Sequence, residues 1–253
     1  MSETRLLAEN ATHLPMPVWQ RVDELATGPH ARLVQQVNAG DAAALLAAQI
    51  VLRERPDREL LQSTLRFVDD SDELRKELAI RAAYASGHTQ LIDHALALLA
   101  SPDLKRRAGA VRGLGFAREP LALLPLLRLV TMGDATAPLA IWALGEIAVP
   151  HALVERVLFD AYRARFCFSE ALIAIGKLGS LPALPRLVLA AHRDPVQALQ
   201  AALALSLRHD LTMLPPPTRA RLRSQFVLLS KKHLGSTEQV LLRALAIRLG
   251  QPI

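Results

Sequence analysis

Apolar residues recur along most of the chain with the spacing of amphipathic α-helices, and the whole pattern is repeated several times. One copy is LKRRAGAVRGLGFAREPLALLPLL at 104–127. The copies align on a marker column with intervals of 31, 30, 31 and 30 residues, formed by Tyr84, Gly115, Gly145, Gly176 and Ser206. Five positions earlier every copy has alanine, at Ala79, Ala110, Ala140, Ala171 and Ala201. Small and aliphatic residues therefore share one helical face in each copy.

Each copy is predicted to form two helices separated by a break. Acidic residues that can cap the first helix lie about twelve positions before the marker, at Asp72, Asp103 and Asp194, with Asp134 one position out of step. Gly87 and Gly179 suit a left-handed turn at the end of that helix. Proline, which tolerates the missing N–H at a helix start, stands where the second helix would begin, at Pro120, Pro150 and Pro182. Matching residues at Asp41, Ala48, Leu52 and Arg53 add a sixth copy.

Repeats of this length stack on their neighbours, because one copy alone cannot bury its apolar face. The sequence is 51% hydrophobic and 4% aromatic. It contains no evident β-branched runs that alternate with period two, so it favours an all-α fold. We expect one elongated, curved domain over residues 1–253. It comprises N-terminal cap helices at 15–40, repeats at 41–208 and a C-terminal capping repeat at 209–253, after a break at Pro215, Pro216 and Pro217.

Three segments, RRAGAVRGLGFAREPLALLPLL, APLAIWALGEIAVPHALV and SEALIAIGKLGSLPALPRLV, resemble bacterial HEAT-like repeats, also called PBS-lyase HEAT-like repeats. The similarity is clear over 72–208 and weaker over 41–71. The resemblance implies a right-handed α-solenoid of about 6–7 helical hairpins. It implies a fold more strongly than a function, since such solenoids serve as scaffolds, chromophore-lyase subunits, iron-dependent hydroxylases and DNA glycosylases.

The sequence offers no catalytic constellation, so we expect no enzymatic activity, cofactor or metal. The hydroxylases of this family bind iron through His-Glu pairs, and no histidine here is followed by Glu. The single thiol, Cys167, lies between two phenylalanines and favours a buried structural role. Trp19 and Trp142 do not cluster as the aromatic residues of a base-flipping groove would. Action on a protein-bound chromophore stays open as an alternative.

One cysteine excludes an intramolecular disulfide framework, and the polar N-terminus MSETRLLAENATH lacks the basic-then-apolar pattern of a signal sequence. These features predict a cytoplasmic protein. The longest apolar stretch, 120–150, is interrupted by Arg128, Asp134 and Glu146, so we expect no membrane span. The abundance of Ala, Leu, Arg and Pro suggests a bacterial source with a GC-rich genome.

Most of the net charge of +6 lies at the C-terminal end, where seven Lys and Arg residues from 209 onward oppose only Asp210 and Glu238. The candidate basic patch comprises Arg219, Arg221, Arg223, Lys231 and Lys232. One interpretation is a solvated cap whose cations stabilise a helix C-terminus. The alternatives are contact with an acidic protein or with a phosphate backbone.

The column three residues before the marker predicts a partner-binding surface at Arg81, Arg112, Trp142, Ile173 and Leu203. If this column is exposed, its last three members form an apolar ridge that suits a partner or self-association. The alternative is that local packing covers them.

The second helices are predicted to line the concave side. Their exposed positions would include Glu59, Ser63, Arg66, Gln90, His94, Arg128, His151, Glu155 and Arg186. This mixed charge suits a peptide or protein segment better than duplex DNA, and its histidines favour ordinary surface roles.

We therefore expect a non-enzymatic scaffold or adaptor that binds a protein partner. A nucleic-acid-binding or lesion-recognition protein that uses the basic C-terminal repeats is the main alternative. The oligomeric state stays open.

Overall fold

The structure is a computed structural model that describes residues 16–250, and within this range it is all-helical, which confirms the predicted all-α class. Residues 16–250 form fifteen α-helices and three short 3-10 helices. Internal contacts divide the chain into two compact units, Met1–Ala97 and Leu98–Ile253. The organisation of residues 1–253 as one repeat domain stays a prediction.

The first unit has helices in two rows. One row contains α2 (Met16–Thr27), α4 (Ala42–Glu54) and α6 (Glu73–Ala85), with α4 packed against both of the others. The second row contains α3 (His30–Asn38) and α5 (Arg58–Leu65), which pack on each other and on the first row. Helix α7 (Thr89–Leu98) follows α6. The core is aliphatic and includes Leu33, Leu45, Leu52 and Leu60, each at most 2% exposed.

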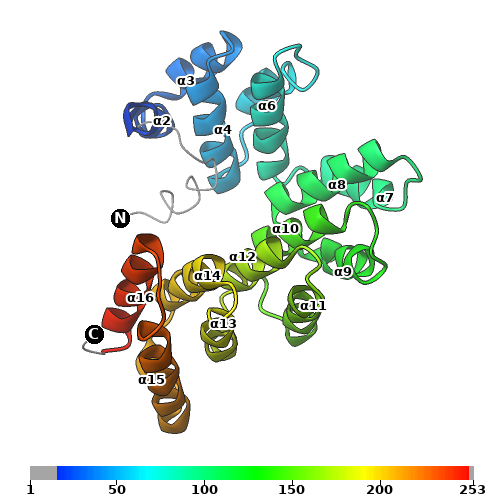
Figure 1. Ribbon diagram of the computed structural model, residues 1–253. Coiled ribbons are helices and arrows are strands. Elements are labelled where there is room, and N and C mark those ends of the chain that lie inside the picture. The colour runs from blue at the N-terminus through cyan, green and yellow to red at the C-terminus, as the bar shows by residue number, and fades with distance from the viewer. Residues whose placement is uncertain (1–15, 251–253) are drawn as a thin grey trace. The chain divides into compact units, whose positions relative to one another are not determined.

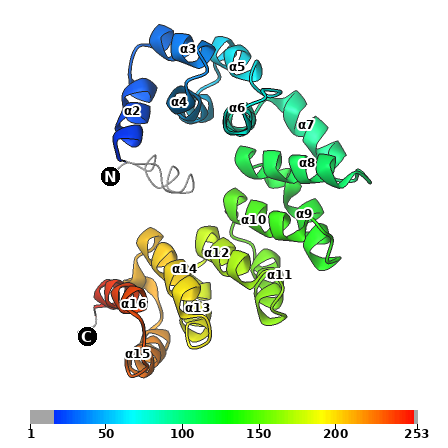
Figure 2. The same cartoon turned by 45° about the horizontal axis from the view of Figure 1, so that its top comes forward.

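The second unit repeats the two-row arrangement, as Figures 1 and 2 show. Each first-row helix packs on the next one in the order α8 (Leu104–Ala117), α10 (Ala137–Ile147), α12 (Phe168–Leu178), α14 (Pro195–Arg208) and α16 (Ser236–Arg248). The second row comprises α9 (Leu123–Thr131), α11 (Ala152–Arg163), α13 (Leu184–Ala190) and α15 (Pro216–Ser230), which pack on α10, α12, α14 and α16 respectively.

Glycines of the marker column allow first-row helices to approach closely. A Cβ added to Gly145 would lie 2.8 Å from Ala174 Cα, and one added to Gly176 would lie 2.8 Å from Ala201 Cα. At Gly115 the nearest atom would be Trp142 Cζ3, at 2.7 Å. Carbon atoms in contact normally lie about 3.5–4.0 Å apart. The column is therefore small in this unit because a neighbouring helix occupies the space of a side chain.

Most of the predicted helix starts and ends are confirmed. Asp41, Asp72 and Asp103 each cap a first-row helix by accepting hydrogen bonds from backbone N–H groups of its first turn. Gly87 and Gly179 adopt the predicted left-handed conformation, with φ of 63° and 70°. The N-terminal cap expected at 15–40 contains the helix pair α2–α3, and the C-terminal repeat expected at 209–253 contains the pair α15–α16.

Asp194 corrects the capping prediction. It occupies the N-cap position of α14, but its side chain accepts no capping hydrogen bond. Its Oδ2 instead accepts from the Tyr162 hydroxyl at 3.0 Å and from Arg165 at 2.6 Å. Burial, and next the hydrogen bond to Asp194, raise the pKa of Tyr162. Asp194 is 8% exposed, so this carboxylate joins two consecutive repeats in the interior.

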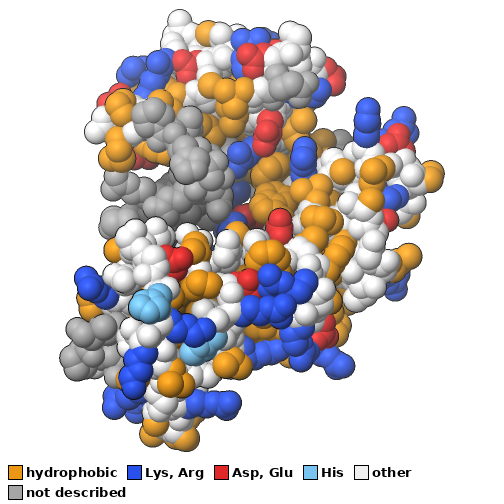
Figure 3. Space-filling model, viewed as in Figure 1, with side chains coloured by type: hydrophobic (Ala, Val, Ile, Leu, Met, Phe, Trp, Pro, Cys, Tyr) orange, Lys and Arg blue, Asp and Glu red, His pale blue; other side chains and the backbone are white. Residues whose placement is uncertain are grey.

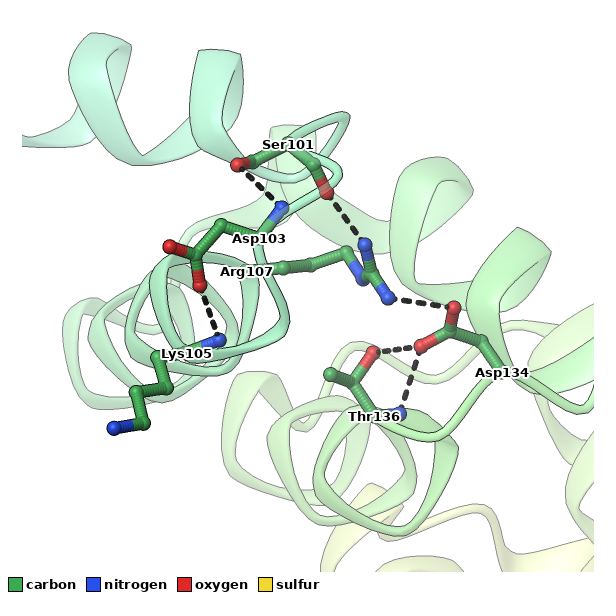
Figure 4. Close-up of polar contacts among 6 residues, drawn as sticks. All are labelled: Ser101, Asp103, Lys105, Arg107, Asp134 and Thr136. Carbon is green, nitrogen blue, oxygen red and sulfur yellow. Dashed lines mark hydrogen bonds and ion pairs between the residues drawn. The ribbon is translucent and has the colours of Figure 1, made fainter.

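Asp134 is not the N-cap of α10, which is Thr136, but its carboxylate contacts both this residue and the preceding first-row helix, as Figure 4 shows. Its Oδ1 accepts from the Thr136 N–H at 2.7 Å and from the Thr136 hydroxyl, at the start of α10. Its Oδ2 accepts from Arg107 of α8 at 2.9 Å. Arg107 also donates to the Ser101 carbonyl. The hydrogen bonds from Thr136, assisted by Arg107, lower the pKa of Asp134.

The prolines differ from their predicted positions. Pro120 and Pro182 lie in 3-10 turns, Pro120–Ala122 and Leu181–Ala183, and the second helix begins after each turn. Pro150 precedes His151, which is the N-cap of α11. Pro216 and Pro217 are the first residues of α15 and so begin this helix instead of breaking the chain before it, because a first-turn N–H has no intrahelical partner.

Candidate functional site

Apolar side chains reach the surface on successive first-row helices of the second unit. Ile173 of α12 is 42% exposed, and Trp142 of α10 and Leu203 of α14 are half-buried. Leu207 is one helical turn beyond Leu203 and is 56% exposed. We call Phe116, Trp142, Ile173, Leu203 and Leu207 the apolar stripe. Figure 3 shows hydrophobic side chains gathered over α8 and α10.

Local packing covers part of Trp142. Its ring meets Phe116 edge-on, with the ring centroids 5.1 Å apart and the planes at 75°. Trp142 also lies over Gly115, which leaves room for the indole because it has no side chain. Trp142 of α10 therefore packs against α8, whereas Ile173 is exposed to solvent. The predicted ridge is therefore exposed at Ile173 and partly covered by local packing at Trp142.

A half-buried ion pair borders the stripe. Lys177 of α12 donates to Glu146 of α10, and the two side chains are 18% and 12% exposed. Glu146 follows Trp142 by four residues, and Lys177 follows Ile173 by four, so each charge lies one turn from a stripe residue. The ion pair links two adjacent helices. Because its two charges are opposite, it adds no net charge beside the apolar side chains.

The two arginines of the predicted column lie in different units. Arg112 is exposed on α8, in the same column as Trp142, and so provides a cation near one end of the stripe. Arg81 is half-buried on α6, in the first unit. The apolar stripe belongs wholly to the second unit, which also contains Arg112.

The predicted second-helix surface is partly corrected. Glu59, Gln90, His94 and Arg128 are exposed as expected, and Glu155 is half-buried. Exposed Arg66 donates to Asn38 at 3.2 Å. Ser63 is 5% exposed, so its assignment to the surface was wrong. It lies one turn after the buried Leu60 and shares the inward face of α5.

Two members of this surface have local structural contacts. His151 Nδ1 accepts a hydrogen bond from the Leu153 N–H, as an N-cap does. The Arg186 guanidinium lies 3.5 Å from the centroid of the Phe159 ring. Burial, and then the charge of Arg163, lower the pKa of Arg186.

The basic patch is distributed around α15. Arg221, Arg223, Lys231 and Lys232 are exposed, whereas Arg219 is half-buried. Lys232 donates to the His192 carbonyl at 2.7 Å, so its charge lies beside α13. Burial, and next the charge of Lys232, lower the pKa of His192. Figure 3 shows Lys and Arg side chains around α15.

Cys167 is half-buried, which is less than predicted, and it has φ of 50° just before α12. Burial, and next the charge of Glu170, raise the pKa of its thiol. Among residues 16–250 no group of three or more His, Cys, Asp or Glu side chains is arranged to hold a metal ion. No helix in the same range is long and apolar enough to cross a bilayer.

The first unit contains a cavity of about 970 Å³ between α5 and the segment from the end of α6 into α7. Gln90 and His94, both predicted to lie on a binding surface, line it. Sequence reasoning missed Arg58, Gln62 and His88, which also line it. Their signal was weak, because only the packing of α5 beside this segment brings them together.

No protein-family model matches the chain, and no curated protein matches it significantly. The arrangement of side chains therefore carries the functional argument.

Proposed function

We propose that the chain is a non-enzymatic HEAT-like adaptor, a right-handed, curved α-solenoid of about 6–7 repeats that binds a protein partner through the apolar stripe. The two rows of successively packed helices support this architecture. The observation that carries the binding proposal is the exposure of Ile173, beside Trp142 and Leu203 in the same column of neighbouring helices. Clustered exposed apolar groups with an aromatic member are typical of protein interfaces.

Such an adaptor would bind by presenting regularly spaced side chains on a surface that fits its partner. A partner helix or loop laid across α10, α12 and α14 would contact one stripe residue from each helix. Because first-row helices pack at about 8–10 Å between axes, a crossing partner needs apolar residues at about seven-residue intervals, which rise by about 10 Å along a helix. Arg112 would favour an acidic residue at the α8 end of this partner.

The test is affinity capture from nuclease-treated lysate of the source cells with wild type, Ile173→Asp and Leu189→Asp. Leu189 lies in the second row on α13 and is 54% exposed, so it is a matched control with no part in the stripe. We expect a defined partner to be retained by wild type and by Leu189→Asp and lost with Ile173→Asp. Equal retention by all three proteins would refute binding at the stripe.

A second candidate function is nucleic-acid binding through the basic patch. The exposure of Arg221, Arg223 and Lys231 on the last helix pair favours it. Binding of a fluorescent DNA duplex should then weaken steeply with salt, and Arg221→Ala with Arg223→Ala should reduce the slope. Binding that does not depend on salt would exclude phosphate contact.

A further inference from the structure

The cavity of the first unit is lined by both aliphatic and hydrogen-bonding side chains and has no role in the proposed adaptor function. Its lining comes from α5 and the residues before it, and from the α6–α7 connection and α7, which Figure 2 labels. The lining residues are Pro56, Asp57, Arg58, Leu61, Gln62, Leu65, Ser86, Gly87, His88, Gln90, Leu91 and His94. All belong to the first unit. A volume of about 970 Å³ is at the upper end of the range for small-ligand sites.

Helical spacing places apolar and polar groups together on this lining. On α5, Arg58, Leu61 and Leu65 lie at i, i+3 and i+7, which is one face of the helix. On α7, Leu91 is three residues before His94. Leu61 and Leu91 are half-buried, whereas Arg58 and His94 are exposed. Leu61 and Leu91 therefore lie deeper than Arg58 and His94, whose hydrogen-bond donors are nearer to solvent.

The charge of the lining is unbalanced. Asp57 is its only acidic residue, and its Oδ1 caps α5 by accepting from the Leu60 N–H at 2.9 Å. The other oxygen, Oδ2, lies 2.6 Å from His30 Nε2, and the Asp57 side chain is only 14% exposed. Arg58 has no ion-pair partner among residues 16–250. A cation with five donors therefore faces the cavity together with histidine and glutamine side chains.

We propose that this cavity binds a carboxylate that carries an aliphatic chain, with the carboxylate paired to Arg58 and the chain against Leu61 and Leu91. An arginine holds a carboxylate with two parallel hydrogen bonds, which a neutral amide cannot replace. The aliphatic groups add affinity by removing apolar surface from water. Two sources offer this chemistry: the C-terminus of a peptide that ends in leucine, and a free medium-chain fatty acid.

The test is a titration of the full chain, followed by 1H–15N NMR, with three probes: N-acetyl-Ala-Leu-Leu free acid, the same peptide as its C-terminal amide, and octanoate. We expect at least one acid to shift amides within 56–65 and 86–94, with a Kd below about 1 mM. The amide should bind at least about 10-fold more weakly than the peptide acid if the peptide is the ligand. The tighter of the two acids identifies the source, and binding of either supports the proposal.

Arg58→Gln should weaken the bound acid about 10-fold or more. Arg55→Gln is the matched control, because Arg55 is exposed, close in sequence and outside the lining. Both substitutions are at exposed positions, so both proteins should keep the wild-type spectrum. Failure of both acids to bind, or equal binding by wild type and Arg58→Gln, would overturn the assignment. These outcomes do not depend on the apolar stripe, whose test uses other residues.

Discussion

The close approach of α10 and α12 makes a sharp prediction for Gly145. Replacing it with alanine adds one methyl group, which would lie 2.8 Å from Ala174 Cα and 2.9 Å from Ala174 Cβ. The first of these is a backbone atom, so rotation of a side chain cannot relieve the clash. The two helices must instead move apart by roughly 1 Å to reach normal contact distance.

Two opposing effects determine the size of the change. Alanine stabilises a helix interior by about 1 kcal/mol relative to glycine. Overpacking a close contact costs about 1–3 kcal/mol. The net loss for Gly145→Ala is therefore about 0–2 kcal/mol. Gly109→Ala is the matched control, because Gly109 lies inside α8, is exposed and has nothing within 4 Å of an added Cβ. It should gain the helix-propensity term alone.

The measurement is urea unfolding followed by far-UV circular dichroism, with thermal unfolding as a second probe. Gly109→Ala should unfold at a higher urea midpoint than wild type, and Gly145→Ala at the wild-type midpoint or a lower one, with a difference of about 1–3 kcal/mol between the variants. That difference corresponds to roughly 2–12 °C in Tm for a chain of this size. If Gly145→Ala is as stabilising as Gly109→Ala, the close-approach account of the marker column is wrong.

Three further predictions concern single side chains. Tyr162→Phe removes a donor to the buried Asp194 and should cost about 1–3 kcal/mol in urea unfolding, whereas no loss would mean that the hydroxyl is not needed there. Asp134→Asn should cost about 1 kcal/mol at neutral pH. Because the folded state lowers the pKa of Asp134, its contribution is present above the unfolded value, near 3.8, and is lost as pH falls through the folded value, so the variant should show a shallower acid loss of stability. Trp142→Ala should cost about 1.5–3 kcal/mol, between core and surface values, and a change below about 0.5 kcal/mol would show that Trp142 packing is not stabilising.

The repeat pattern predicted the helices well because it records packing directly. Alanines five positions before the marker are at most 4% exposed in α6, α8, α10, α12 and α14. Helix caps were predicted equally well where the capping residue contacts only its own helix. Asp103 caps α8 with hydrogen bonds to the Lys105 and Arg106 N–H groups, and any helix start with this spacing favours the same contact.

Contacts between repeats were harder to predict, because they depend on which way a side chain turns. Asp194 has the same place in its repeat as Asp103, yet it faces Tyr162 and Arg165 of the preceding repeat. The cavity was missed for a related reason. Arg58 and His94 are 36 residues apart, and no binding motif in the sequence around either of them indicates a shared site.

The marker glycines and the apolar stripe follow from the same geometry. Successive residues of a helix are about 100° apart, so positions three residues apart, such as Trp142 and Gly145, point about 60° from each other. The face that contacts the next helix therefore adjoins the face that carries the stripe. A small residue at the marker brings adjacent helices close together, and this closeness places stripe residues of neighbouring helices side by side. A larger residue at Gly145 should therefore weaken binding at the stripe as well as packing, because it would widen the spacing between Trp142 and Ile173.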